Sequence, residues 1–217
     1  MIVAIDGPAG AGKSTVAKAV ARALCWDYLD TGAMYRAVAL KAMESGVRPG
    51  DADALTKIAR EVDIGAKGET VLLDGQDVTG RIRDSDVTEV VPAVAAVRGV
   101  RDAMVSLQRR AAGRGDVVIE GRDIGTNVAP EAEVKVFLTA SAEERARRRV
   151  RQQGLVESAE VMEQVEASIV ERDGVDSGRR ESPLIQDPAA VLIDSTHMSV
   201  DEVVAEIVAL VEQRAAL

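Results

Sequence analysis

A glycine-rich motif directly follows the first apolar run of the chain. The stretch GPAGAGKST, residues 7–15, comes right after IVAI, residues 2–5, and has a glycine, four residues and then Gly-Lys-Ser. This is the spacing of a phosphate-binding loop. Glycines let several backbone N–H groups point into one hollow, and the positive end of the following helix favours an anion there. The motif predicts a strand, a loop and a helix over residues 13–24, and the alternative is a flexible Gly/Ala turn.

Four further segments predict buried strands that end in polar residues. They are WDYLDTG, DVVIEGRD, VKVFLTAS and AVLIDST, at residues 26–32, 116–123, 134–141 and 190–196. Helix-like stretches follow them, at residues 33–43, 130–133, 143–153 and 200–213. This alternation predicts an α/β fold with a five-stranded parallel P-loop sheet and helices on both faces. Ligand-binding groups then belong at the carboxyl ends of the strands, which directs attention to Thr31, Arg36, Arg122 and Asp123.

The alternation is interrupted between residues 51 and 93. The segment VLLDGQDVT, residues 71–79, has two short runs around Asp74-Gly75, which is a hairpin signal. DIGAKGET, residues 63–70, is interpreted as an earlier edge strand with its turn. We therefore expect a small antiparallel insertion at 51–93, in a core made of residues 1–50 and 94–217.

Composition excludes several functions. The formal charge of −9 argues against a nucleic-acid polymer as partner, because a polyanion requires a basic surface. His197 is the only histidine, which excludes His-rich metal sites and argues against histidine acid–base catalysis. Cys25 is the only cysteine and is expected to be a packed thiol. Without a signal peptide or a membrane-length apolar run, the expected location is cytoplasmic, away from membranes.

The motif leaves several classes of phosphate-loop protein open. A regulatory GTPase needs an Asn-Lys-x-Asp element, but the only asparagine, Asn127, is followed by Val128. An ATP-driven motor or transporter would bring a signature segment and usually a longer chain. A small-molecule kinase fits the length and the arginines near several strand ends best. A nucleotide-binding regulatory protein without turnover is the alternative from another class.

Several segments along the whole chain resemble bacterial cytidylate kinases. They are AIDGPAGAGKST, LDTGAMYRA, VTGRIR, EGRDIGT, VKVFLTAS with RARRR, and ERDGVDSGRRESPL. The resemblance implies transfer of the ATP γ-phosphate to CMP or dCMP in pyrimidine metabolism. We expect the chain to act as a monomer. It also implies that residues 51–93 form the nucleotide-monophosphate-binding domain and that about 143–184 form a helical lid. Another small P-loop kinase, for another nucleoside monophosphate, shikimate or dephospho-coenzyme A, is the alternative.

The donor side of the expected site is built on the glycine-rich loop. Lys13 is expected to reach the outer phosphates of ATP, and the Ser14 hydroxyl to ligate Mg²⁺. Arg147, Arg148 and Arg151 are candidates to close on the transferring phosphoryl group, and spacing alone does not choose among them. The expected catalytic residues are Lys13, Arg122 and Arg148. The expected ATP-binding residues are Gly7, Pro8, Ala9, Gly10, Ala11, Gly12, Lys13, Ser14, Thr15 and Arg147.

The resemblance also implies an acceptor site for CMP. It assigns Arg36 and Arg122 to the phosphate, Arg172 and Asp176 to the ribose, and Arg101, Asp123 and Arg179 to cytosine. Thr31 would lie in this pocket, and Tyr35 would line it mainly through packing. The alternatives are a surface arginine at position 36 and ordinary ion pairs for Asp123 and for Arg172 with Asp176.

One residue departs from the family pattern. Pro92 stands where related enzymes carry a serine that contacts the base, and proline has neither a hydroxyl nor a backbone N–H. One base contact is therefore missing, and the local helix is expected to start or kink at Pro92.

Overall fold

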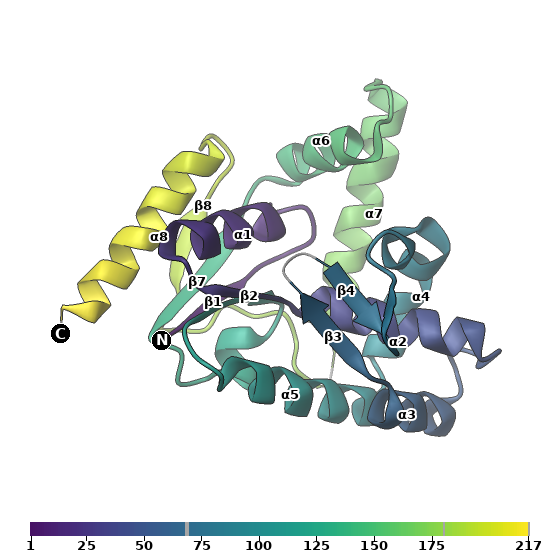
Figure 1. The fold of residues 1–217 in the computed structure, drawn as a ribbon. Coiled ribbons are helices and arrows are strands. Elements are labelled where there is room, and N and C mark those ends of the chain that lie inside the picture. The colour runs from purple at the N-terminus through teal and green to yellow at the C-terminus, as the bar shows by residue number, and fades with distance from the viewer. Residues whose placement is uncertain (68–69, 180, 217) are drawn as a thin grey trace. The chain divides into compact units, whose positions relative to one another are not determined.

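The computed structural model describes residues 1–67, 70–179 and 181–216, and the chain divides into two compact units (Figure 1). The first unit comprises Met1–Tyr28 and Gly115–Leu217, and the second comprises Leu29–Arg114. The expected insertion at 51–93 falls within the second unit, together with sequence on either side of it.

The first unit is built on a parallel sheet. Within the described residues this sheet has five strands in the order β2-β6-β1-β7-β8. β1 pairs in parallel with β6 and β7, and β7 pairs in parallel with β8, which confirms the predicted α/β class. The strands are β1 (Ile2–Asp6), β2 (Asp27–Asp30), β6 (Val117–Gly121), β7 (Val134–Thr139) and β8 (Val191–Asp194).

Small branched side chains form the core of this unit. β1, β6 and β7 contribute buried valines, isoleucines and a leucine, and helices α1 (Lys13–Leu24) and α8 (Val200–Ala215) pack against them. The two helices also contact each other, as Figure 1 shows for the purple and yellow ribbons. α8 begins at a capping box formed by Ser199 and Glu202, which satisfies N–H groups of its first turn.

The segment between β6 and β7 differs from its prediction. Residues 130–133 were expected to form a short helix, but they form a turn. The helical turn instead comes earlier, at Ile124–Val128, where the carbonyl of Asp123 accepts from the N–H groups of Asn127 and Val128. β7 begins at Val134, so residues 130–133 leave no room for a helix before the chain re-enters the sheet.

Two helices follow β7. α6 (Ala142–Gln153) is capped by Ser141 and ends at Gly154, whose φ of 65° is in the left-handed region. α7 (Ala159–Ser177) is capped by Ser158 and packs against α6. Among the residues described, no helix combines the length and the apolar character needed to cross a bilayer.

The second unit is mainly helical. It contains α2 (Thr31–Glu44), α3 (Ala52–Glu61), α4 (Ser85–Ala95) and α5 (Arg98–Ala112), with a short helical turn at Arg81–Arg83. The carboxylates of Asp30 and Asp51 cap α2 and α3 by accepting from N–H groups of their first turns. These helices enclose their own apolar core, in which Leu40, Leu55 and Ile82 are fully buried.

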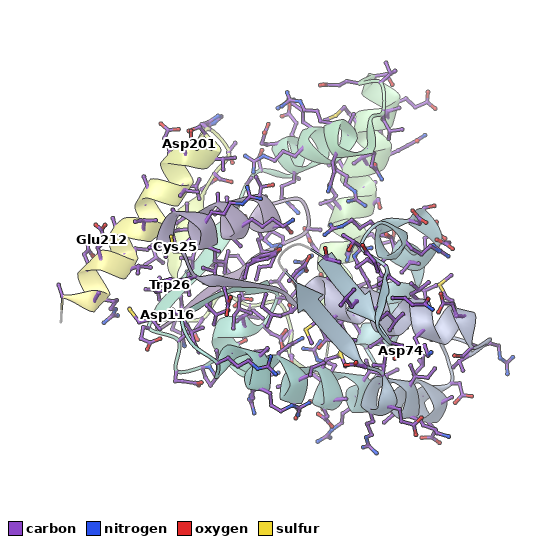
Figure 2. All side chains as sticks on the ribbon, viewed as in Figure 1. Cys25, Trp26, Asp74, Asp116, Asp201 and Glu212 are labelled. Carbon is purple, nitrogen blue, oxygen red and sulfur yellow. The ribbon has the colours of Figure 1, made fainter. Side chains whose placement is uncertain are left out.

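A small antiparallel sheet lies in the second unit, as predicted. β3 (Ile64–Lys67) pairs with β4 (Thr70–Leu73), which pairs with β5 (Gln76–Asp77). Asp74 and Gly75 turn the β4–β5 hairpin with φ of 50° and 81°, the conformation that an Asp-Gly turn favours. Asp74, marked in Figure 2, also pairs with Lys41 at 2.6 Å. Residues 68 and 69 of the predicted edge strand and turn lie outside the described residues.

Pro92 lies inside α4. The helix begins at Ser85, so the expectation that it starts at Pro92 is wrong. Val87, Val91 and Val94 are buried at helical spacing on either side of the proline, and their burial carries the helix through it. The N–H of Ala96 still reaches the Pro92 carbonyl at 3.1 Å.

Cys25 is exposed, contrary to the expectation of a packed thiol. It follows the last turn of α1 in a left-handed conformation, with φ of 57° and ψ of 38°. This turns the chain into β2, and the N–H of Trp26 bonds to the Ala21 carbonyl at 2.9 Å. Figure 2 marks Cys25 and Trp26 at this end of α1.

Candidate active site

The glycine-rich loop connects β1 to α1 through backbone conformations that need glycine. Gly10 and Gly12 have φ of 76° and 90°. At Gly7 a Cβ atom would lie 2.0 Å from the Leu138 carbonyl oxygen of β7, so no other residue fits there. Gly12 is the N-cap of α1 and provides no side-chain cap. The positive end of α1 therefore faces the loop, which is the arrangement that binds phosphate.

Lys13 is buried in the first turn of α1, and its Nζ donates to the Pro8 carbonyl at 2.7 Å. Burial, reinforced by the nearby Arg122, lowers the pKa of Lys13 to about 7, although Glu120 and Asp6 raise it. The negative charges around the buried Lys13 ammonium do not compensate for its burial and for the nearby Arg122. A bound phosphate would supply it, so the electrostatics fit an anion site.

Glu120 is a site residue that the sequence did not single out. It is buried near the carboxyl end of β6, where one oxygen accepts from Ser14 Oγ at 2.9 Å and the other accepts from Tyr28 Oη. The expected metal ligand Ser14 thus lies beside a carboxylate. The one signal in the sequence was an acidic residue inside an otherwise apolar strand, VVIEG, because a buried carboxylate needs partners.

Asp6 at the end of β1 is a second buried carboxylate that accepts hydrogen bonds with both oxygens. Its two oxygens accept from the N–H groups of Ile124 and Gly125, each at 2.8 Å. Burial raises the pKa of Asp6 to about 6, although the two N–H bonds lower it. Asp6 therefore fixes the backbone immediately after the expected site residues Arg122 and Asp123.

The structure brings several expected acceptor residues together after β6. Arg122 Nε donates to Asp176 Oδ2 at 2.8 Å, and Arg179 forms an ion pair with the other Asp176 oxygen. Although burial raises it, the pKa of Asp176 is lowered overall by Arg122 and Arg179. Burial lowers the pKa of Arg172, and nearby Arg122 lowers it further. Three arginines around one carboxylate leave a net positive cluster.

Asp123 lies beside this cluster in sequence and is buried. Its Oδ2 accepts from Asn127 Nδ2 at 3.1 Å, within the helical turn that follows β6. Asn127 also donates to Ser182 Oγ at 3.0 Å. The amide of Asn127 therefore helps to orient the Asp123 side chain.

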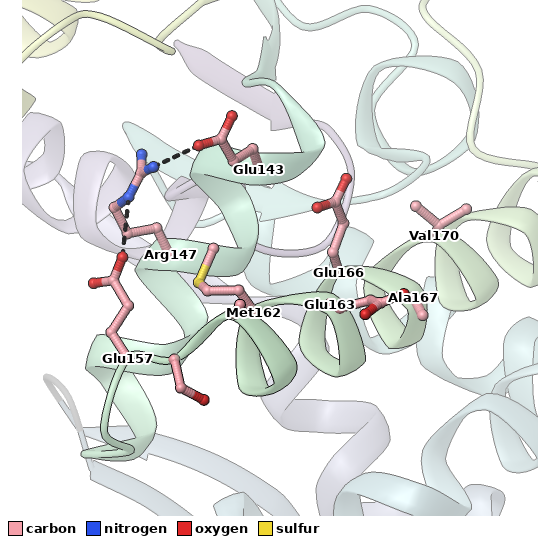
Figure 3. Close-up of a pocket in the computed structure, with 10 residues that line it drawn as sticks. Glu143, Arg147, Glu157, Met162, Glu163, Glu166, Ala167 and Val170 are labelled. Carbon is pink, nitrogen blue, oxygen red and sulfur yellow. Dashed lines mark hydrogen bonds and ion pairs between the residues drawn. The ribbon is translucent and has the colours of Figure 1, made fainter.

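The arginines of α6 separate into different environments. Arg147 pairs with Glu143 and Glu144 at 2.6 and 2.7 Å and with Glu157 at 3.6 Å. It lines a groove of about 690 Å³ between α6 and α7, whose wall also includes Met162 and Val170 (Figure 3). Arg151 is exposed.

Arg148 faces the glycine-rich loop instead. Its Nη1 donates to the Ala11 carbonyl at 3.1 Å and to Ser195 Oγ at 3.0 Å, and its Nη2 donates to the Ser195 carbonyl at 2.7 Å. Its Nε donates to Glu144 at 3.0 Å. Of the expected lid arginines, Arg148 is thus the one bonded to the loop, and its guanidinium is engaged by protein oxygens.

Arg149 is an arginine that the sequence did not single out. It is partly buried, which lowers its pKa, and it is near enough to Arg172 to disfavour the charge of that residue. Its Nη1 donates to Gln152 at 3.1 Å. Arg149 therefore adds a further positive charge near Arg172.

The expected acceptor residues of the second unit lie on α2 and α5. Arg36 Nη1 donates to Thr88 Oγ1 at 2.6 Å and to the Ile82 carbonyl at 3.1 Å. The buried Arg101 guanidinium lies 5.6 Å from the centre of the Tyr35 ring, a cation–π contact. Thr31 is buried in the first turn of α2. Arg36 is therefore held by the protein rather than freely solvated.

The fold and the loop define a class. A parallel sheet whose first strand leads through a glycine-rich loop to a buried lysine, next to arginine-rich helices, is typical of P-loop kinases that act on small molecules. A solved structure of an uncharacterized protein from Eubacterium ventriosum has a similar fold, with a TM-score of 0.54 and 14% identity over 98% of each chain.

Sequence comparison then identifies the family. The family model described as Cytidylate kinase matches residues 3–213. A cytidylate kinase of Desulforamulus reducens is 51% identical over 97% of this chain and 96% of its own. One from Mycobacterium avium is 48% identical over 99% of this chain and 96% of its own. The chain belongs to the cytidylate kinase family, which confirms the resemblance.

Proposed function

We propose that this chain transfers the γ-phosphate of ATP to CMP or dCMP, giving ADP and CDP or dCDP. The observation that carries the proposal is the positive cluster of Arg122, Arg172 and Arg179 around Asp176, in a chain of the cytidylate kinase family. An acceptor that is itself a phosphate suits this excess of positive charge. As expected from the sequence, we propose that the chain acts as a monomer in the cytoplasm.

Binding of ATP would use the loop between β1 and α1. Backbone N–H groups of residues 7–15 and the Lys13 ammonium would hold the donor phosphates. Lys13 now bonds to the Pro8 carbonyl, so it would exchange this neutral oxygen for a charged one when ATP arrives. That exchange favours the charged form of a buried amine.

The residues beside the loop fit Mg²⁺. Hard cations prefer oxygen ligands, and Mg²⁺ usually keeps several waters while taking one or two protein oxygens plus substrate phosphates. Ser14 Oγ lies 2.9 Å from Glu120 Oε2, so an alcohol and a carboxylate oxygen are both next to the loop. We propose that Ser14 ligates the ion and that Glu120 orients Ser14. Mg²⁺ would neutralise charge on the phosphates when bound.

The acceptor needs no general base. A phosphate monoester has a second pKa of about 6, so at neutral pH one of its oxygens is ready to attack the γ-phosphorus. The new bond forms as the bond between that phosphorus and the β–γ bridging oxygen breaks, and ADP leaves with the electron pair. Catalysis is then mainly positioning and charge stabilisation, for which Lys13, Arg122 and Arg148 are the proposed catalytic residues.

Roles for the remaining residues follow the sequence expectations. Arg147 is proposed as a further ATP-binding residue. We propose that CMP is bound in the first unit by Arg122, Asp123, Arg172, Asp176 and Arg179. In the second unit we propose Thr31, Tyr35, Arg36 and Arg101. The environments on α6 add Arg149 to the candidates for the transferring phosphoryl group, because it adds positive charge near Arg172.

A panel of acceptors tests the proposal. ADP production should be measured by a coupled assay with CMP, dCMP, UMP, AMP, shikimate and dephospho-coenzyme A, each with and without EDTA. CMP and dCMP should give the highest kcat/KM, and EDTA should abolish turnover. If another acceptor exceeds both cytidine nucleotides, the substrate assignment is wrong. If none gives ADP, the proposed kinase activity is wrong, and the alternative of a nucleotide-binding protein without turnover is favoured.

A further inference from the structure

An ion pair holds the tip of the glycine-rich loop by bonding to both the N–H and the carbonyl of one residue, Ala9. The N–H of Ala9 donates to Asp173 Oδ1 at 3.0 Å, and the carbonyl of Ala9 accepts from Arg145 Nη1 at 2.9 Å. Arg145 and Asp173 also bond directly to each other. The pair therefore satisfies both backbone polar groups of Ala9.

Two further contacts fix the position of Arg145. Its Nε donates to the Ala140 carbonyl at 3.1 Å, at the end of β7. A Cβ on Gly10 would lie 3.0 Å from both the Cβ and the carbonyl oxygen of Arg145, so the loop packs directly on α6 at this point. The side chains of Arg145 and Asp173 are only 10% and 18% exposed. Solvent and salt therefore screen the attraction between the two charges only a little.

α7 carries the other partner and also residues of the proposed acceptor site. Asp173 directly follows Arg172 and comes three residues before Asp176, a spacing that places the two aspartates on neighbouring positions of one helix face. Asp176 bonds to Arg122 at the end of β6. One helix thus holds the loop through Asp173 and the arginine cluster through Asp176.

We propose that Arg145 and Asp173 form a positioning pair that fixes the glycine-rich loop relative to α7. The pair touches no substrate in this role. It sets the spacing between the donor phosphates on the loop and the arginines near α7, and its kinetic consequence rests on the proposed function. Because phosphoryl transfer depends on alignment, an error of about 1 Å in that spacing costs roughly 10²-fold in rate.

The test compares Asp173→Asn and Arg145→Lys with Asp187→Asn. Asn keeps an acceptor for Ala9 but loses the charge, and Lys keeps the charge but loses the fork. Asp187→Asn is the matched control, because it makes the same change in an ion pair of similar burial, with Lys135 at 2.8 Å, which joins β7 to residue 187 rather than the loop to α7. Asp173→Asn should lower kcat by roughly 10–100-fold while KM for ATP and CMP changes less than about threefold. The kcat of Arg145→Lys should lie between those of Asp173→Asn and the wild type. The kcat of the control should lie within about twofold of the wild-type value.

Hydrogen exchange provides a readout that does not need turnover. In the nucleotide-free wild type the Ala9 amide should be protected, and in Asp173→Asn it should exchange about tenfold faster or more, together with amides in the last turns of α7. An unprotected Ala9 amide in the wild type would overturn the proposal, even if both variants failed to fold. So would an unchanged kcat in folded Asp173→Asn, or an equal loss in the control. Absence of CMP turnover by the wild type would instead overturn the proposed function alone.

Discussion

Replacing the buried lysine of the glycine-rich loop should make the protein more stable and inactive at once. The substitution is Lys13→Met, which keeps most of the side-chain volume and removes the charge. Lys13 is 6% exposed, and its only described hydrogen bond is to the Pro8 carbonyl. In the absence of nucleotide its charge is therefore disfavoured by burial.

The size of the effect follows from the pKa of Lys13. Burial lowers that pKa from 10.5 to about 7. At about 1.36 kcal/mol per pKa unit, the charged form is disfavoured by roughly 5 kcal/mol. Losing the bond to the Pro8 carbonyl offsets about 1.5–3 kcal/mol of this. Lys13→Met should therefore raise the free energy of unfolding by roughly 2–3 kcal/mol below pH 7.

The pH dependence has a definite sign. Between about pH 7 and 10.5 the unfolded lysine holds a proton that the folded lysine has lost, so wild-type stability gains from this group as the pH rises. The variant has no such gain. Its stability advantage should therefore be greatest below pH 7 and disappear as the pH approaches 10.5.

Urea unfolding without nucleotide, at pH 6.5 and pH 10, measures this difference. Turnover with ATP and CMP should fall by about 10²–10³-fold or more, the scale for removing one charge donor at the transition state. A variant less stable than the wild type at pH 6.5 would refute the claim that Lys13 is electrostatically unsatisfied. Activity near the wild-type level would refute its proposed role.

Three further outcomes are expected. Asp123→Asn should cut kcat/KM for CMP by roughly 10²–10⁴-fold and affect UMP far less, since a carboxylate accepts from the cytosine amine; equal losses would mean that Asp123 does not read the base. The rate should rise with pH and level off above the second phosphate pKa of about 6, and His197→Gln should change it less than about tenfold, which steady-state profiles of both proteins will check. The exposed Cys25 should react with one equivalent of a thiol reagent in the folded, active enzyme; a thiol that reacts only after unfolding would contradict its exposure.

Local patterns predicted much of the fold. The loop after β1, the Asp74-Gly75 hairpin and the presence of five parallel strands follow from neighbours in sequence: glycine conformations, turn chemistry and apolar runs. The order of those strands in the sheet was not predicted. The helices of the second unit were less visible. Pro92 suggested that a helix starts or kinks there, whereas α4 begins at Ser85 and the burial of valines on one face carries it through the proline.

The sequence by itself determined the P-loop class, the parallel sheet and the family, because these depend on residue types at fixed spacing. Only the tertiary structure decided which charges meet. Glu120 reaches Ser14, Asp6 reaches the turn after β6, and Arg145 reaches Ala9 and Asp173. These partners lie far apart in sequence, and the cost of burying an unpaired charge selects them during packing. For the same reason the run RARRR could not reveal where each arginine lies. Arg145 and Arg148 bond to the glycine-rich loop, whereas Arg147 lines the acidic groove between α6 and α7.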